Sequence, residues 1–328
     1  MVDLPPSSKP SRWDGLLETS VVGSFTSIGY KVRSRRWDDL DTGSLAGKVV
    51  VITGATSGIG KKVAAEMAQN GARLRLVARN EPKVRDLVTE LQDSSRNTDI
   101  GYYLADLSLV SQVQAAADKI LAGEPTIDVL INNAVILPPE RILTAEGLEL
   151  SHATNLVAPF ALTNALIPRL VESAPAQIIN VISGGMYTQG IRIDDLNFAD
   201  GEYRGSVAYA RAKRGLMILT KLWAEQLEGT GVTVNATHPG WVNTPGVKDS
   251  LPAFHRVMRP LLRTPEQGAD TIMWLASSPV ATRQSGKLWH DRQARTEYRL
   301  SSTRETAADR DALWNSLTST VAELTATG

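Results

Sequence analysis

The sequence contains no cysteine, carries no net charge and has no long hydrophobic run. Without cysteine there are no disulfides, thiolate nucleophiles or cysteine-bound metals. Basic and acidic residues number 35 each, so no overall field favours nucleic acid. No run of about 18 apolar residues indicates a membrane span, and the first residues lack a secretory signal. The few histidines have no ligand spacing, so we expect no metal and a soluble, cytoplasmic protein. The histidines are His152, His238, His255 and His290.

Short apolar runs alternate with helical patterns from residue 48 onward. We expect strands at residues 49–52, 74–80, 100–108, 127–135, 176–183, 232–240 and 286–290. Helices are expected at 63–71, 82–92, 110–122, 145–171, 207–228 and 265–277, with Pro159 and Pro168 bending or dividing the one at 145–171. The alternation predicts one α/β domain with a doubly wound parallel sheet of about seven strands, of Rossmann type, and helices on both faces. This domain spans residues 45–300, between an extension (1–44) and a helical tail (301–328).

The extension has two parts. Residues 1–11 are rich in Pro and Ser and are expected to be disordered. Residues 13–37 carry apolar side chains at helical spacing and end in a basic cluster of Lys31, Arg33, Arg35 and Arg36. This segment either packs on the domain or a second subunit, which is the simpler interpretation, or lies on a membrane surface.

A glycine-rich turn follows the first expected strand, with Gly54, Gly58 and Gly60 at a G-x-x-x-G-x-G spacing. Such a turn lets the backbone approach a pyrophosphate at the N-terminus of the next helix. It is not a Walker loop, because Lys61 is followed by Lys62 rather than by Ser or Thr. Tight packing alone would also explain the glycines.

Four polar residues form a candidate catalytic group. Tyr209 and Lys213 lie four residues apart and share one helix face. An ammonium beside a phenol is expected to lower the phenol's pKa toward neutrality. Ser183, at the carboxyl end of a strand, is placed to donate to a carbonyl oxygen, and Asn155 puts an amide inside a helix. Each residue also has a structural interpretation: a solvated pair, a turn cap and a satisfied buried amide.

Together these motifs resemble the short-chain dehydrogenase/reductase family over residues 45–286, and within it the retinol-dehydrogenase-like group. The matching positions, in order, are Thr53-Gly54-x3-Gly58-x-Gly60, Asp106-Leu107, Asn132-Asn133-Ala134, Asn155, Ser183, Tyr209-x3-Lys213 and Pro239-Gly240. Each motif is weak singly, but their order makes the joint signal strong.

The resemblance implies a role for each matching residue. Tyr209 exchanges a proton with the substrate oxygen, Lys213 lowers the pKa of Tyr209 and binds the nicotinamide ribose, Ser183 orients the carbonyl, and Asn155 holds a water that links Lys213 to solvent. The implied cofactor contacts are Gly54, Ser57, Ile59 and Gly60 at the pyrophosphate, Asp106 and Leu107 at the adenine, Asn133 and Ala134 at the adenosine ribose, and Pro239, Val242 and Thr244 around the carboxamide. Val135 and Ala158 stand where the family has glycine, which leaves the local geometry in question.

The residues after the second expected strand bear on cofactor choice. An acidic residue there would bind the ribose hydroxyls of NAD, but the sequence has Ala78 and then Arg79, a good phosphate partner. We therefore expect NADP(H), with NAD(H) as second choice.

The expected function is hydride transfer between nicotinamide and a carbonyl or alcohol substrate. Met186, Tyr187 and Trp241 would form the substrate wall, with residues 247–262 as a lid, and their apolar character favours a lipophilic substrate. The alternative is a catalytically idle dinucleotide-binding or regulatory scaffold, and a membrane-surface enzyme is a third interpretation. Family habit suggests a homo-oligomer.

Overall fold

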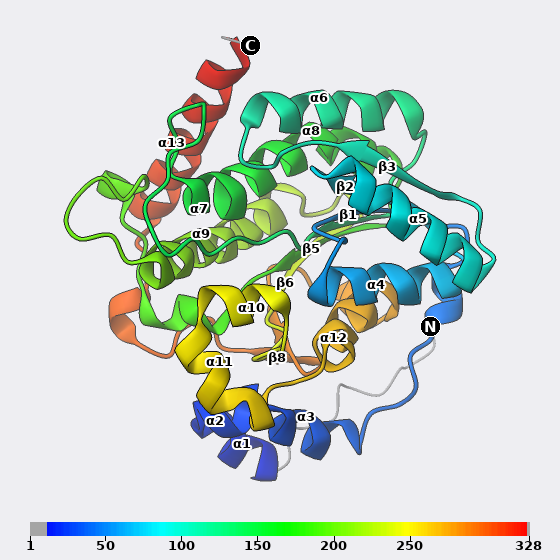
Figure 1. Cartoon of the computed structure of the whole chain (residues 1–328), viewed down its shortest axis with the longest axis horizontal. Helices are drawn as coiled ribbons and strands as arrows, with labels where there is room; N and C mark the ends of the chain where they lie inside the picture. Colours follow the sequence, from blue (N-terminus) through cyan, green and yellow to red (C-terminus); the bar gives the residue numbers. More distant parts are fainter. Residues whose placement is uncertain (1–11, 327–328) are drawn as a thin grey trace.

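The computed structural model describes residues 12–326 and contains one eight-stranded sheet (Figure 1). The strand order is β3-β2-β1-β4-β5-β6-β7-β8, and all neighbours are parallel except β7 and β8. The strands are β1 (Val49–Thr53), β2 (Arg73–Ala78), β3 (Ile100–Leu104), β4 (Val129–Asn132), β5 (Ala176–Val181), β6 (Val232–Thr237), β7 (Leu288–His290) and β8 (Gln293–Arg295). The doubly wound parallel sheet is thus confirmed. The sequence interpretation missed β8, a three-residue antiparallel edge strand.

Helices cover both faces of the sheet because successive strand residues point to opposite sides. Val51 packs into one core with α6, α8 and α9, whereas Val50 and Ile52 pack into a second core with α4, α5 and α12. Figure 1 shows these two helical layers on either side of the strands. The helices are α4 (Gly58–Gln69), α5 (Glu81–Ser95), α6 (Val110–Gly123), α8 (Ala158–Glu172), α9 (Gly205–Gln226) and α12 (Pro265–Ser277).

The long helix expected at residues 145–171 begins later and is divided. A short helix α7 (Leu150–His152) runs into a π-helical turn (Ala153–Val157) and then into α8. Pro159 lies directly after the π-helical turn, at the start of α8, and Pro168 lies inside that helix. Residues 143 and 149 form an isolated antiparallel bridge instead of helix.

The N-terminal extension forms three short helices, α1 (Arg12–Thr19), α2 (Val21–Phe25) and α3 (Ser27–Ser34), that dock below β8 and α11 (Figure 1). Arg33, part of the expected basic cluster, is buried in ion pairs with Asp14 and Asp291 at 2.6 and 2.7 Å. The segment is therefore packed on the domain. The expectation of disorder for residues 1–11 lies outside the described residues.

The C-terminal tail contains the helix α13 (Ala307–Ala326), which packs on α6 and α9. Leu313 and Leu317 are fully buried, and the ring of Trp314 meets that of Phe160 edge-on at 5.0 Å. No helix in residues 12–326 is both long and apolar enough to cross a bilayer.

Candidate active site

The glycine turn between β1 and α4 requires glycine at three positions. Gly54 and Gly58 have φ of +68° and +55°, in the left-handed region that side chains disfavour. A Cβ on Gly60 would lie 2.4 Å from both the amide nitrogen of Asn133 and the carbonyl oxygen of Gly54. The turn is therefore pressed against the end of β4.

The N-terminus of α4 suits a phosphate group. The hydroxyl of Ser57, the N-cap residue, makes no capping hydrogen bond, and the first turn has no acidic residue. The N-terminus of this twelve-residue helix therefore presents backbone N–H groups and the positive end of the helix dipole, with no acidic side chain of its own to neutralise them. The residues present thus fit a dinucleotide pyrophosphate.

The ends of β1 and β4 are tied together by polar contacts. The Asn133 amide donates to the carbonyl oxygens of Thr53 and Gly54 at 2.9 and 3.1 Å. The Thr53 hydroxyl accepts hydrogen bonds from the backbone N–H groups of Asn133 and Ala134, both at 3.0 Å. Because the side-chain amide of Asn133 donates to two backbone carbonyl oxygens of the turn, Asn133 holds the turn in its shape.

The two departures from the family glycines are tolerated here. Val135 is not among the described residues with positive φ, and its side chain is 56% exposed, so it crowds nothing. Ala158 is buried in the first turn of α8 and lines a small pocket with Thr53, Leu107 and Ala134. Neither side chain closes the nucleotide side of the site.

Arg79 follows directly after β2 and is exposed. Its guanidinium lies 3.9 Å from the carboxylate of Asp106, which follows β3, and 66% of its side chain is accessible. Asp106 also accepts from the hydroxyl of Ser108 at 2.8 Å. The two residues therefore meet at the carboxyl edge of adjacent strands, as their positions in the sequence predict.

The structure brings three of the four candidate catalytic residues together. Tyr209 is partly exposed on α9 and lies beside Ser183, which is two residues beyond β5. The ammonium of Lys213 lies 5.8 Å from the centre of the Tyr209 ring. Ser183 also caps the next turn, since its hydroxyl accepts from the N–H of Gly185 at 3.2 Å.

Asn155 lies in the π-helical turn, and its side chain is fully satisfied by protein. Its oxygen accepts from the N–H of Ile136 at 3.1 Å, and its nitrogen donates to the carbonyl oxygens of Ile136 and Ser151 at 2.8 and 2.9 Å. The side chain thus fastens the loop after β4 to the helix that contains Asn155. The water-holding role stays a prediction.

The pKa of Tyr209 differs from the expectation. Burial raises it to about 12, against the opposing effect of the Ser183 hydrogen bond. Burial also lowers the pKa of Lys213 to about 7, because its ammonium is taken out of water with only a carbonyl partner. In this structure the pKa of Tyr209 is therefore raised rather than lowered, because burial disfavours the phenolate. The role of Lys213 in lowering that pKa stays a prediction.

The loop after β6 closes over the glycine turn. A Cβ on Gly58 would lie 3.1 Å from the methyl group of Thr244, and one on Gly268 would meet both Val242 and Ile59. Thr244 caps α10 (Pro245–Ser250), the first helix of the expected lid, which continues as α11 (Pro252–Met258). The predicted carboxamide loop and the predicted pyrophosphate turn are thus neighbours.

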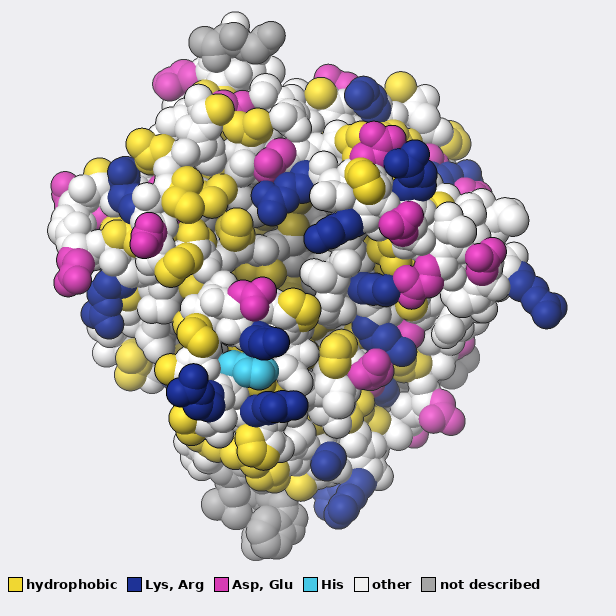
Figure 2. Space-filling view, viewed as in Figure 1, with side chains coloured by type: hydrophobic (Ala, Val, Ile, Leu, Met, Phe, Trp, Pro, Cys, Tyr) yellow, Lys and Arg dark blue, Asp and Glu magenta, His cyan; other side chains and the backbone are white. Residues whose placement is uncertain are grey.

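The predicted substrate wall is less uniform. Met186 and Tyr187 are buried, and the Tyr187 hydroxyl donates to the carbonyl oxygen of Thr296 at 2.9 Å. Trp241 is partly exposed and meets Phe254 of α11 edge-on at 5.1 Å. Figure 2, drawn in the same view as Figure 1, shows a hollow in the surface just above the position of α10 and α11, with apolar side chains in it. Trp241 is thus the best placed of the three to contact a substrate.

Some residues next to the site were missed by the sequence interpretation. Phe25 packs against His238, and His238 stacks on His290 at 4.9 Å between ring centres. Arg263 is fully buried beside them and pairs with Asp291 at 2.6 Å. None of these residues belongs to a motif, and they are far apart in the sequence, so only the fold brings them together.

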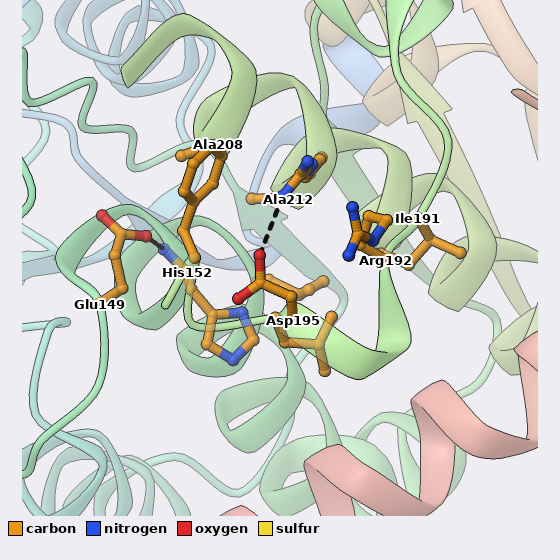
Figure 3. A pocket seen from close by; sticks show the side chains of 11 residues that line it. Glu149, His152, Ile191, Arg192, Asp195, Ala208 and Ala212 are labelled. Atoms are coloured by element: carbon orange, nitrogen blue, oxygen red, sulfur yellow. Dashed lines mark hydrogen bonds and ion pairs between the residues drawn. The ribbon is translucent and has the colours of Figure 1, made fainter. Parts of the chain in front are cut away.

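A second depression lies between α7 and α9 and has a different character (Figure 3). Its acidic groups already have partners. Glu149 accepts from the N–H groups of Ser151 and His152, and Asp195 pairs with Arg211 at 3.5 Å. These contacts tie both carboxylates to neighbouring residues.

Comparisons with known proteins agree with this dinucleotide-binding architecture. The sequence profile of the family described as short chain dehydrogenase matches residues 48–253. Dehydrogenase/reductase SDR family member 12 of Bos taurus is 38% identical over 88% of this chain and 91% of its own length. Retinol dehydrogenase 12 of Bos taurus is 38% identical over 75% of this chain and 78% of its own. The RhlG/NADP active-site complex of Pseudomonas aeruginosa is 25% identical over 75% and 95% of the two chains, with a TM-score of 0.62.

The fold and site thus define an α/β oxidoreductase of the Rossmann class. The chain belongs to the short chain dehydrogenase family and is similar to its retinol dehydrogenase members.

Proposed function

We propose that this protein is an NADP(H)-dependent oxidoreductase that transfers hydride between nicotinamide and a carbonyl or alcohol carbon. The observation that carries the proposal is the placement of Tyr209 beside Ser183, with Lys213 one helical turn away. A phenol whose pKa is raised to about 12 is protonated at neutral pH. It is therefore a proton donor to a carbonyl oxygen that Ser183 also holds.

The cofactor would be held by the glycine turn, by the N-terminus of α4 and by the loop at Val242 and Thr244, and it would supply the hydride. Arg79 supports NADP(H) over NAD(H), because an exposed guanidinium next to the strand end suits a 2′-phosphate. In addition, position 78 is alanine, so no acidic side chain there would repel that phosphate. The bound NADP of the RhlG structure supports the same choice.

The proposed substrate is lipophilic. Trp241, in the loop after β6, and Phe254, on α11 of the expected lid, contribute aromatic surface next to the site. Retinol dehydrogenases are among the relatives. The alternative, a catalytically idle scaffold, would keep the dinucleotide site but turn nothing over.

A parallel fluorescence titration with NADPH and NADH tests the cofactor assignment. We expect tighter NADPH binding, followed by NADPH oxidation with apolar aldehydes or ketones. NADPH binding with no turnover on any carbonyl would favour the idle scaffold. Binding of neither nucleotide would refute the proposal.

We also propose peripheral contact with a membrane. Aliphatic side chains on α2 and α3 remain exposed beside basic ones, which suits an anionic bilayer surface. The exposed residues are Val21, Val22, Ile28 and Val32, with Lys31, Arg35 and Arg36. Co-sedimentation with anionic liposomes tests this, with the Ile28→Ser/Val32→Ser variant as comparison, and equal pelleting of the two proteins would reject it. A homo-oligomer stays a prediction.

A further inference from the structure

The N-terminal helices reach the two loops that carry the site. Phe25, the last residue of α2, is 3% exposed, and its ring lies edge-on to His238 at 4.3 Å and to Trp241 at 5.9 Å. These two residues flank Pro239 and Gly240. The ring of Phe25 therefore packs directly on the loop expected to hold the nicotinamide carboxamide.

The same ring touches the turn after β5. A Cβ on Gly184 would lie 2.7 Å from Cε2 of Phe25 and 2.9 Å from Nε2 of His238. Gly184 follows Ser183, which lies beside Tyr209. Phe25 and His238 thus both lie against the backbone that follows Ser183, and the ring of Phe25 contacts the loop after β6 as well.

The main chain of the segment is bonded to the same loop. The carbonyl oxygen of Phe25 accepts from the N–H of Trp241 at 2.8 Å and from Arg263 at 3.1 Å. Arg263 in turn donates its own N–H to the carbonyl oxygen of Trp241 at 2.7 Å. A Cβ on Gly240 would lie 2.3 Å from Nε of Arg263, so the guanidinium lies against the loop.

Buried charge holds the segment in place. Arg33 and Arg263 both pair with Asp291, at 2.7 and 2.6 Å, and Arg295 pairs with Asp14 at 2.7 Å. All of these side chains are less than one tenth exposed. The anchoring makes the position of Phe25 a fixed feature of the fold.

We propose that Phe25 is a positioning residue of the active site, which sets the spacing between Ser183 and the loop of residues 239–242. Residues 12–37 are then a working part of the enzyme, although they lie outside the region that matches the family profile. The inference rests on the proposed oxidoreductase function.

The test compares Phe25→Ala with Val22→Ala, which changes an exposed residue of the same helix. The turnover number is expressed per bound NADPH, determined by titration, so that a loss of folded protein does not count. We expect Phe25→Ala to lower it about ten- to a hundredfold, because a misplacement of about 1 Å costs up to about 10²-fold. Phe25→Leu, which restores apolar volume, should recover most of the loss, and Val22→Ala should match the wild type.

A double-mutant cycle with Gly184→Ala tests the contact itself. The added Cβ should slow turnover in the wild type but have a smaller effect beside Phe25→Ala, because the ring it would strike is gone. If Phe25→Ala does not fold, the cycle is run with Phe25→Leu.

The outcomes separate the two proposals. If the wild type is active and Phe25→Ala is equally active, the role of Phe25 is overturned and the proposed function stays intact. Additive effects of the two substitutions in the cycle would have the same meaning. Wild type that binds NADPH but reduces no carbonyl would overturn both.

Discussion

The ammonium of Lys213 lies 2.9 Å from the carbonyl oxygen of Val181, the last residue of β5. Lys213 is 2% exposed, and none of the ion pairs among the described residues includes it. Burial without an anion disfavours the charged form, which is why its pKa falls from 10.5 to about 7. A carbonyl and a nearby phenol ring leave this lysine poised between its two protonation states at neutral pH.

This burial gives a stability prediction that does not depend on function. Between pH 7 and 10.5 the unfolded chain holds a proton on Lys213 that the folded chain has released. The free energy of unfolding should therefore rise with pH in this window, and the contribution is absent in Lys213→Met. Urea unfolding of both proteins from pH 7 to 9.5 measures the difference. Lys61→Met, at an exposed lysine, is the control, and parallel curves for wild type and Lys213→Met would contradict the prediction.

Replacing Tyr209 with Phe removes the proton donor and little else. We expect unchanged NADPH affinity and a turnover number reduced by about 10²- to 10⁴-fold, the usual contribution of a positioned acid. Stopped-flow NADPH oxidation gives the rate. Tyr102→Phe, which loses only a contact with Glu81 at 3.2 Å, should behave as wild type. A Tyr209→Phe variant with more than about a tenth of wild-type turnover would remove the tyrosine from its role.

Local patterns in the sequence were sufficient to predict the strands of the sheet, apart from β8, and the positions of the motifs at the strand ends. The apolar run at 49–52 becomes β1, and the helix expected at 265–277 is α12. The glycine spacing predicts the turn because only glycine adopts the φ of Gly54 without strain. These features depend on neighbours within a few residues.

Other features depend on contacts between distant segments. Phe25 and Gly184 lie against each other although about half the chain separates them. The spacing of apolar residues along the sequence cannot predict such a contact. The strand β8 is three residues long and follows a turn at Asp291 and Arg292, both of which have positive φ. The pKa of Tyr209 follows from burial, which spacing along α9 cannot reveal.

Arg79→Asp should change the nucleotide preference. A charge-assisted contact to the 2′-phosphate is worth about 1.5–3 kcal/mol, so the ratio of NADPH to NADH affinity should fall by about 10- to 100-fold. Fluorescence titration with both nucleotides gives the ratio. Arg85→Asp introduces the same charge change at an exposed position of α5 and should leave it unaltered. An unchanged ratio in Arg79→Asp would place the phosphate elsewhere.

Gly60→Ala tests the packing of the turn. The new methyl group would meet the Asn133 amide and the Gly54 carbonyl at 2.4 Å, so one of them must shift. We expect a loss of about 1–3 kcal/mol in stability, as for other overpacked sites, together with weaker NADPH binding. Chemical denaturation and nucleotide titration measure the two effects. Gly246→Ala, where a Cβ meets nothing within 4 Å, is the matched control, and identical behaviour of the two variants would disprove the close contact.

Asp291 is the carboxylate on which the N-terminal helices depend. It accepts from Arg33 at 2.7 Å and from Arg263 at 2.6 Å, and together with His290 these arginines hold its pKa far below the ordinary value despite its burial. Asp291→Asn leaves the buried guanidinium of Arg263 without its counter-ion and takes one of its carboxylate partners from Arg33, which keeps Asp14. Breaking a buried pair in this way typically costs about 3–5 kcal/mol. Thermal and denaturant unfolding should show this loss, and limited proteolysis should cut sooner within residues 12–37, because Arg33 no longer ties α3 to the sheet. Asp194→Asn, which breaks an exposed pair with Arg192 at 2.9 Å, should leave both measurements unchanged. Were the two variants equally stable, the buried ion pairs would not be what holds the segment, and the packing of Phe25 alone would have to anchor it.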